Sequence, residues 1–241
     1  MSQQRTTVPY APEKVITPAE DAQPTPDEVF DCIQAVAVHT KERINDRDLL
    51  RAQDQFFSAT QIDWEVARQA PESAEYVSMM FSEWLLFEAA VGGRRTPLEA
   101  FVEDVAAHKL EGWQVAALTE VVRTQMFSQF RITNQDPQHG RCVLEDLHDG
   151  AELDLRDGRL SGIPHYATGS MAVRVAHVGA CWYVVGQTYL HDNLEVGQTA
   201  IVPPLAYDQG RCSVMLGILR RLFGENPLYT IRGVRHFDEG R

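Results

Sequence analysis

The sequence predicts an α+β protein: an N-terminal helical region, a small antiparallel β-barrel or curled sheet, and a C-terminal helix. Apolar residues recur at helical spacing up to about residue 126, the period then changes to two, and a last helical pattern follows. The 241 residues, 44% of them apolar, are enough for one large domain or two small ones, each with a core. We therefore expect a flexible tail over 1–25, a helical domain over 26–126, a β-module over 127–205, and a C-terminal helix and tail over 206–241.

Order is expected to begin at Thr25. The preceding residues are polar and interrupted by prolines, so they cannot bury enough apolar surface to offset the entropy of an ordered chain. Thr25 is followed by Pro26 and two acids, the pattern of an N-cap, a proline at the first helical position and negative charge at the positive end of a helix. Further helices are predicted over 46–59 and 64–68.

The most distinctive segment is FSEWLLFEAAVGGRRTPLEAF, over 81–101. It closes a predicted helix over 73–91 whose apolar residues cover more than half of the circumference, which predicts that Trp84 is buried between helices. Gly92 and Gly93 are expected to end that helix, and Thr96-Pro97-Leu98-Glu99 has the pattern of a capping box that begins the next one. One more helix is predicted over 111–125.

Alternating residues and turn motifs predict the β-module. Strands over 141–147 and 152–155 flank His148-Asp149-Gly150, and Asp-Gly is a strong hairpin signal. A second pair is predicted over 171–176 and 182–189. With strands over 127–133 and 199–202, five or six short antiparallel strands favour a small barrel or curled sheet. Residues 207–223 have the i, i+3, i+4, i+7 pattern of the last helix.

The order of these motifs resembles a group of uncharacterised bacterial proteins. The likeness covers roughly residues 75–205 and rests on Trp84, Phe87, the turn over 93–99 and the hairpin at 149–150. Some members of that group also carry a SEC-C motif, a small cysteine-rich zinc-binding element known from the tail of the SecA translocation ATPase. This chain lacks the Cys-x-Cys and Cys-Cys or Cys-His pairs of that element, so the resemblance implies neither a zinc site nor catalytic residues here.

Composition excludes several classes of function. The net charge of −12 disfavours a broad nucleic-acid-binding surface, because an acidic chain repels phosphate backbones. No run approaches the roughly 18 apolar residues of a membrane span, and no secretory signal is predicted. The four cysteines lack the spacing of a disulfide framework, which predicts reduced thiols in a cytoplasm. No motif predicts a cofactor.

One arrangement has the residue types of a metal site. His139 and Cys142 lie three positions apart, His177 and Cys181 lie four apart, and each pair is beside a predicted strand end. Two hairpin ends can bring four nitrogen and sulfur ligands together, as tetrahedral zinc requires. The alternative, that the cysteines are core residues and the histidines lie on turns, is favoured because zinc sites usually have tighter spacing.

A long loop over 161–170 is a candidate contact for a ligand or partner. Its His165 and Tyr166 are the candidate contact residues, together with Trp182 and Arg174 of the neighbouring strands. A plain crossover between the strand pairs is the favoured alternative. Small barrels also bind single strands of nucleic acid through aromatic side chains, but the aromatic residues of these strands have only a weak basic patch beside them.

Two acids in the distinctive helix have apolar neighbours. Glu83 and Glu88 flank Trp84 and Phe87, so burial could shift their pKa values and make one of them functional, although a plain structural role is favoured. The chain has no nucleophile elbow and no phosphate-binding loop. The leading hypothesis is therefore a non-catalytic cytoplasmic interaction or adaptor protein of unknown partner. The alternatives are a metal-dependent enzyme or zinc-binding protein at the His and Cys pairs, and weak single-stranded nucleic-acid binding by the β-module.

Overall fold

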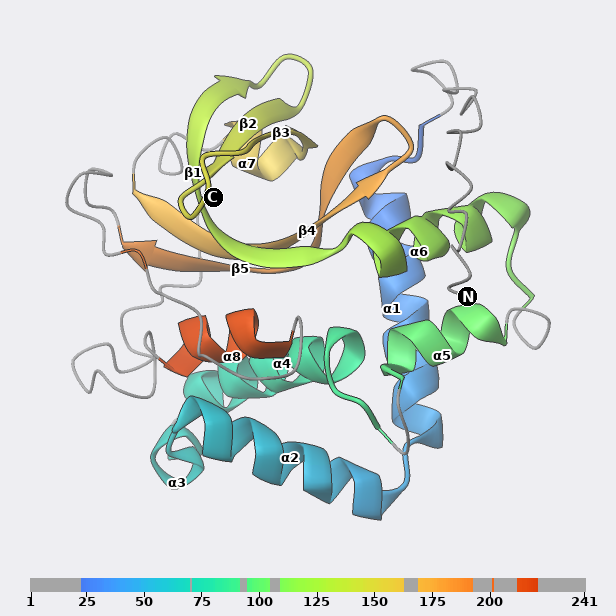
Figure 1. Ribbon diagram of the computed structural model, residues 1–241, viewed down its shortest axis with the longest axis vertical. Coiled ribbons are helices and arrows are strands. Elements are labelled where there is room, and N and C mark those ends of the chain that lie inside the picture. The colour runs from blue at the N-terminus through green and yellow to red at the C-terminus, as the bar shows by residue number, and fades with distance from the viewer. Residues whose placement is uncertain are drawn as a thin grey trace, which may run out of the picture.

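The computed structural model describes residues 23–69, 71–91, 95–104, 109–162, 169–192, 201 and 212–220. Helices lie against a strongly curved sheet, and the α+β class is confirmed (Figure 1). In chain order the described elements are α1 (Pro26–Arg43), α2 (Asp46–Thr60), α3 (Trp64–Ala67), α4 (Pro71–Phe87), α5 (Pro97–Glu103), α6 (Gly112–Thr124), β1 (Met126–Asp136), β2 (Arg141–Asp146), β3 (Glu152–Arg156), α7 (Gly158–Gly162), β4 (Ser170–Val178), β5 (Cys181–Asp192) and α8 (Cys212–Leu219). No helix in these ranges has the length and apolar character that a membrane span needs.

The two helix starts predicted from capping residues, at Thr25 and Thr96, are confirmed. At α1 the amide of Glu28 donates to the Thr25 hydroxyl at 3.2 Å, and the Thr25 amide donates to the Glu28 carboxylate at 2.7 Å. At α5 the same reciprocal pair forms between Thr96 and Glu99, at 3.2 and 2.8 Å. Each pair satisfies two helix-end amides that otherwise have no partner in the helix. The predicted helix stop at 92–93 lies outside the described residues.

The sheet is mixed, which corrects the expectation of purely antiparallel strands. Neighbouring strands follow the order β1-β2-β3-β5-β4, and β1 also pairs with β4, so the ring of pairings is closed. Four pairings are antiparallel, and the contact between β3 and β5 is parallel, through Leu155 and Trp182. Directions cannot alternate all the way round a ring of five, so one pair must be parallel. Of the further strand predicted over 199–202, only Ile201 is described, and it is not in a strand.

Strand β4 is buried on both faces because its side chains alternate between two environments. Met171, Val173 and Val175 pack inside the ring with apolar residues of the other strands. Ala172 and Ala176 face outward, the first into a core with α2, α4 and α8 and the second into a core with α1, α5 and α6. Helices and sheet therefore share their hydrophobic cores, and α4 crosses the junction between the two.

The predicted burial of Trp84 is confirmed. Its side chain is fully buried, with its ring centroid 5.6 Å from Phe56 and 6.2 Å from Phe81. Helix α4 ends at Phe87, earlier than predicted, and the short helix α7 was not predicted. Glu88, the first residue after the end of α4, belongs to the site described below.

Candidate binding site

A bulge in strand β5 lies at the centre of the site. The pairing register shifts between residues 173 and 175 of β4, so that residues 185–187 of β5 lie opposite Arg174 alone. A bulge of this kind interrupts the ladder of backbone hydrogen bonds and redirects side chains, and bulges are common beside functional sites. The backbone amides of the bulge therefore need partners from another element.

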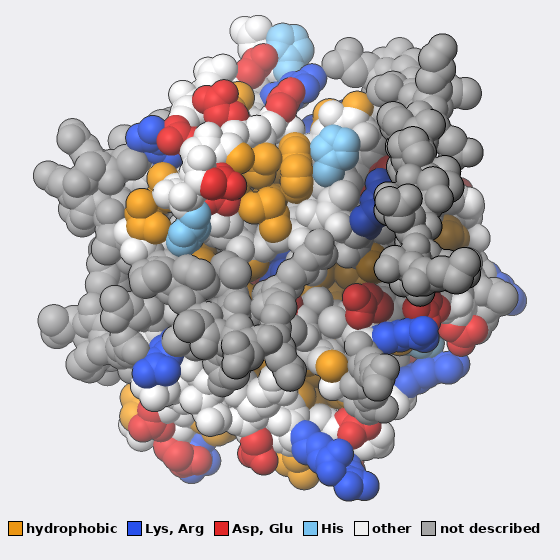
Figure 2. Space-filling view, viewed as in Figure 1, with side chains coloured by type: hydrophobic (Ala, Val, Ile, Leu, Met, Phe, Trp, Pro, Cys, Tyr) orange, Lys and Arg blue, Asp and Glu red, His pale blue; other side chains and the backbone are white. Residues whose placement is uncertain are grey.

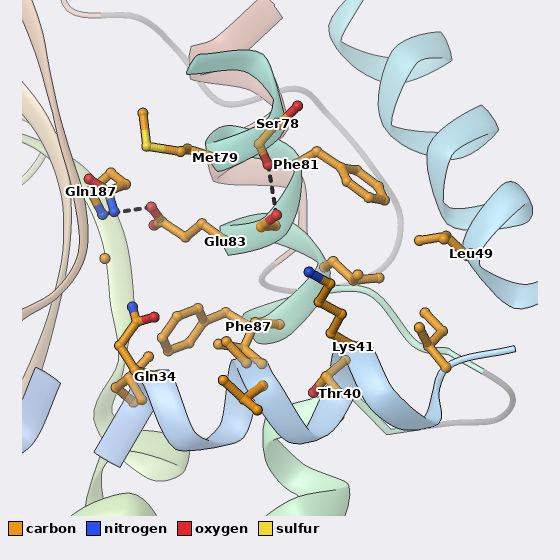
Figure 3. Close-up of a pocket in the computed structure, with 18 of the residues that line it drawn as sticks. Gln34, Thr40, Lys41, Leu49, Ser78, Met79, Phe81, Glu83, Phe87 and Gln187 are labelled. Carbon is orange, nitrogen blue, oxygen red and sulfur yellow. Dashed lines mark hydrogen bonds between the residues drawn. The ribbon is translucent and has the colours of Figure 1, made fainter. Parts of the chain in front are cut away.

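Glu83 of α4 supplies the missing acceptor. Its Oε2 accepts a hydrogen bond from the backbone amide of Gln187 at 2.7 Å (Figure 3). Oε2 also accepts one from the Tyr189 hydroxyl at 3.0 Å, and Oε1 accepts one from Arg174 Nε at 3.0 Å. A Cβ atom at Gly186 would overlap with this carboxylate, so only glycine leaves room for it. The carboxylate thus joins α4 to the bulge.

Arg174 completes a buried ionic cluster between α4 and β4. Its Nη2 donates to Glu88 Oε1 at 2.5 Å, and its Nη1 donates to the Gln125 side chain at the end of α6. The guanidinium carbon lies 4.7 Å from the centroid of the Phe87 ring and 5.3 Å from that of Phe127. Only 1% of the Arg174 side chain is exposed. This corrects the expectation that Arg174 contacts a ligand or partner, because its donors are used inside the protein.

The cluster holds two carboxylates and one guanidinium, which shifts several pKa values. Burial raises the pKa of Glu88. Burial by itself would lower the pKa of Arg174, but the charges of Glu88 and Glu83 raise it. Burial, together with the charge of Glu83, raises the pKa of Tyr189 well above its ordinary value. Each oxygen of Glu83 already has a donor, so this carboxylate suits a structural role better than acid–base chemistry.

A cleft of about 920 Å³ lies beside the cluster, between α1, α2, α4 and β5. Glu83 and the bulge residues 185–187 line one part of it, and most of the remaining lining is apolar. Phe30 and Val38 of α1 belong to this lining and are 37% and 57% exposed. Clefts of this size, mostly apolar with a few polar groups, are typical of ligand sites.

The predicted metal ligands are not brought together. Cys142 lies inside the ring of strands, Cys181 lies in the core with α1 and α6, and His139 is exposed. Among the described residues, which include all four candidates, no group of three or more His, Cys, Asp or Glu side chains could hold a metal ion. The reason is that strand alternation sends the two cysteines into different cores.

The other predicted contact residues are also placed, as far as they are described. His165 and Tyr166 lie outside the described residues. Trp182 is half-buried, and its ring lies 5.4 Å from that of His177. Tyr183 and Tyr189 are fully buried, so they cannot stack on the bases of a nucleic acid. Acidic and basic side chains are interspersed over the described part of the face in Figure 2, which does not suit a phosphate backbone.

Sequence reasoning identified Glu83, Glu88 and Arg174 separately but missed their association and missed the cleft. Two features could have indicated them. Gly186 interrupts the strand pattern of β5, as glycines at bulges and close approaches do. Helix α1 carries Phe30 and Val38 on a second apolar stripe, away from its buried residues Val29, Cys32, Ile33 and Val36.

Comparisons with family models, curated proteins and solved structures find no match to this chain. The resemblance to the bacterial group with SEC-C members therefore rests on sequence motifs alone and stays a prediction.

Proposed function

We propose that this protein is a non-catalytic interaction protein of the cytoplasm whose binding site is the cleft between α1, α2, α4 and β5. The observation that carries the proposal is the apolar lining of this cleft, with Phe30 and Val38 left open to solvent. Exposed apolar side chains gathered in a concave site gain about 25 cal/mol for each Å² that a ligand covers. The buried cluster supports this role by joining α4 rigidly to β5, which are two of the walls.

The chemistry of the buried groups supports binding without catalysis. Burial raises the pKa of Cys32 to about 11 and that of Cys142 to about 12, so both thiols stay protonated at neutral pH and are poor nucleophiles. Those two and Cys181 are buried free cysteines, which suits a reducing compartment. Glu83, the buried carboxylate in the lining of the cleft, is held by three hydrogen bonds.

Site-specific photocrosslinking in the cell that makes the protein tests this proposal. A photoreactive phenylalanine derivative at Val38 should capture a defined molecule, and mass spectrometry should identify the same molecule in repeated experiments. The matched control is Val66 on α3, which is equally exposed, at 55% against 57%, and does not line the cleft. Adducts that are the same at both positions, or no adduct at Val38, would count against the cleft as the binding site.

A further inference from the structure

One positive charge points into the cleft. Lys41 lies on the cleft side of α1, on the same stripe as Phe30 and Val38, and its ammonium group extends from α1 toward α4 (Figure 3). None of the ion pairs among the described residues includes Lys41. Lys41 is exposed, so a counter-charge beside its ammonium group is screened in part by water and adds a modest attraction.

The polar neighbours in the cleft do not supply that counter-charge. The hydroxyls of Ser78 and Ser82 donate to helix carbonyls at 2.7 Å, and the Thr40 hydroxyl donates to one at 2.8 Å. Asp46 and Glu75 also line the cleft, but both are exposed and neither forms an ion pair with Lys41. Their charges oppose any negative charge on a ligand, and a doubly charged ligand more strongly, so one anionic group at Lys41 is the most that the cleft favours.

The rest of the cleft suits the apolar part of a ligand. Phe81, Phe87 and Leu49 are among the walls, and Gln34 and Gln187 provide amide groups near the bulge (Figure 3). A volume of about 920 Å³ is at the upper end of the roughly 300–1,000 Å³ of small-molecule sites. The cleft therefore has space for an apolar body of two or more rings, or an equivalent aliphatic chain, with Lys41 beside it.

We propose that the cleft binds a small organic monoanion with an apolar body, such as a carboxylate or sulfonate on an aromatic or aliphatic group, and that Lys41 pairs with its charge. This inference names the ligand class of the site proposed above and rests on that proposal.

Two fluorescent probes that differ in one charged group test the inference. Anilinonaphthalene sulfonate is an apolar monoanion, and N-phenylnaphthylamine is the same skeleton without the sulfonate. We expect the anionic probe to bind the full-length protein at one saturable site, about two- to fivefold more tightly than the neutral probe. Lys41→Met should remove this difference and leave the affinity for the neutral probe unchanged. Lys109→Met, which removes an exposed lysine that does not line the cleft, should change neither affinity.

Two further variants separate the ligand class from the site itself. Glu75→Gln should strengthen binding of the anionic probe a fewfold, because it removes a like charge from the cleft. Val38→Asp should weaken binding of both probes by placing a carboxylate on the apolar lining. Equal affinities of the two probes, or equal effects of Lys41→Met and Lys109→Met, would refute the anionic ligand class. The cleft would remain the binding site in that case if Val38→Asp still weakens binding. Absence of saturable binding by either probe, or no effect of Val38→Asp, would overturn the inference and the proposed function together.

Discussion

Replacing Arg174 by methionine tests whether the buried cluster holds α4 on the sheet. The guanidinium is 1% exposed and is the charge partner of both Glu83 and Glu88. Methionine retains much of the apolar bulk but leaves two carboxylates buried without a counter-charge. Breaking a buried ion pair from one side costs about 3–5 kcal/mol. In a chain of 241 residues, each kcal/mol lowers the melting temperature by about 2–4 °C, so we expect Arg174→Met to melt roughly 6–20 °C below the wild type.

The double variant Arg174→Met/Glu88→Gln shows whether uncompensated charge is the cause. It removes one of the two buried carboxylates with little change of shape, so it should recover about 1–2 kcal/mol of the free energy of unfolding relative to Arg174→Met. Urea unfolding followed by tryptophan fluorescence measures this, because Trp84 lies in the core next to the cluster. An Arg174→Met protein within 1 kcal/mol of the wild type would refute the reasoning, and so would a double variant no more stable than the single one.

Three further predictions concern the same region and its supports. Burial raises the pKa of Glu88 above its ordinary 4.5, so the folded protein prefers the protonated carboxyl group. The contribution of this preference to the free energy of unfolding is complete at low pH and is lost as the pH rises through the raised pKa. Glu88→Gln should therefore flatten the fall of the unfolding free energy with pH, measured by urea unfolding from about pH 5 to 8. Gly186→Ala should lower the free energy of unfolding by about 1–3 kcal/mol, because the new Cβ atom overlaps with the Glu83 carboxylate in the bulge. The control Gly158→Ala meets no atom within 4 Å and should lower it by well under about 1 kcal/mol. Equal losses in thermal unfolding would contradict the close approach of Glu83 to Gly186. Trp84→Ala should lower the free energy of unfolding by about 3–5 kcal/mol because it empties part of the core. Thr96→Ala should lower it by about 1 kcal/mol because it removes the N-cap of α5. A Trp84→Ala protein that melts like the wild type would show that the core does not depend on this ring.

Features that depend on neighbouring residues were predictable from the sequence. The capping boxes at Thr25 and Thr96 join residues three positions apart, and the Asp149-Gly150 hairpin joins adjacent strands. The helical stripes and the change of period at residue 126 follow from which residues must face a core, and β1 begins at Met126 as a result. The local sequence is therefore enough to predict these caps, turns and element types.

The cluster and the cleft depend on contacts between distant parts of the chain. Arg174 lies 91 residues from Glu83, and no local pattern pairs a strand arginine with one particular helix acid. The same limit applies to the metal hypothesis, which placed Cys142 and Cys181 together although the strands send them into different cores.

The sequence by itself determined most of the described helices and strands to within a few residues, although not α7, and that the chain is an acidic α+β protein. Only the tertiary structure decided that the five-strand ring contains a parallel pair, that the bulge at Gly186 receives Glu83, and that Lys41 points into an apolar cleft. The physical reason is that propensity, capping and periodicity act over a few residues, whereas strand order and the pairing of buried charges are set by packing among segments far apart in the chain.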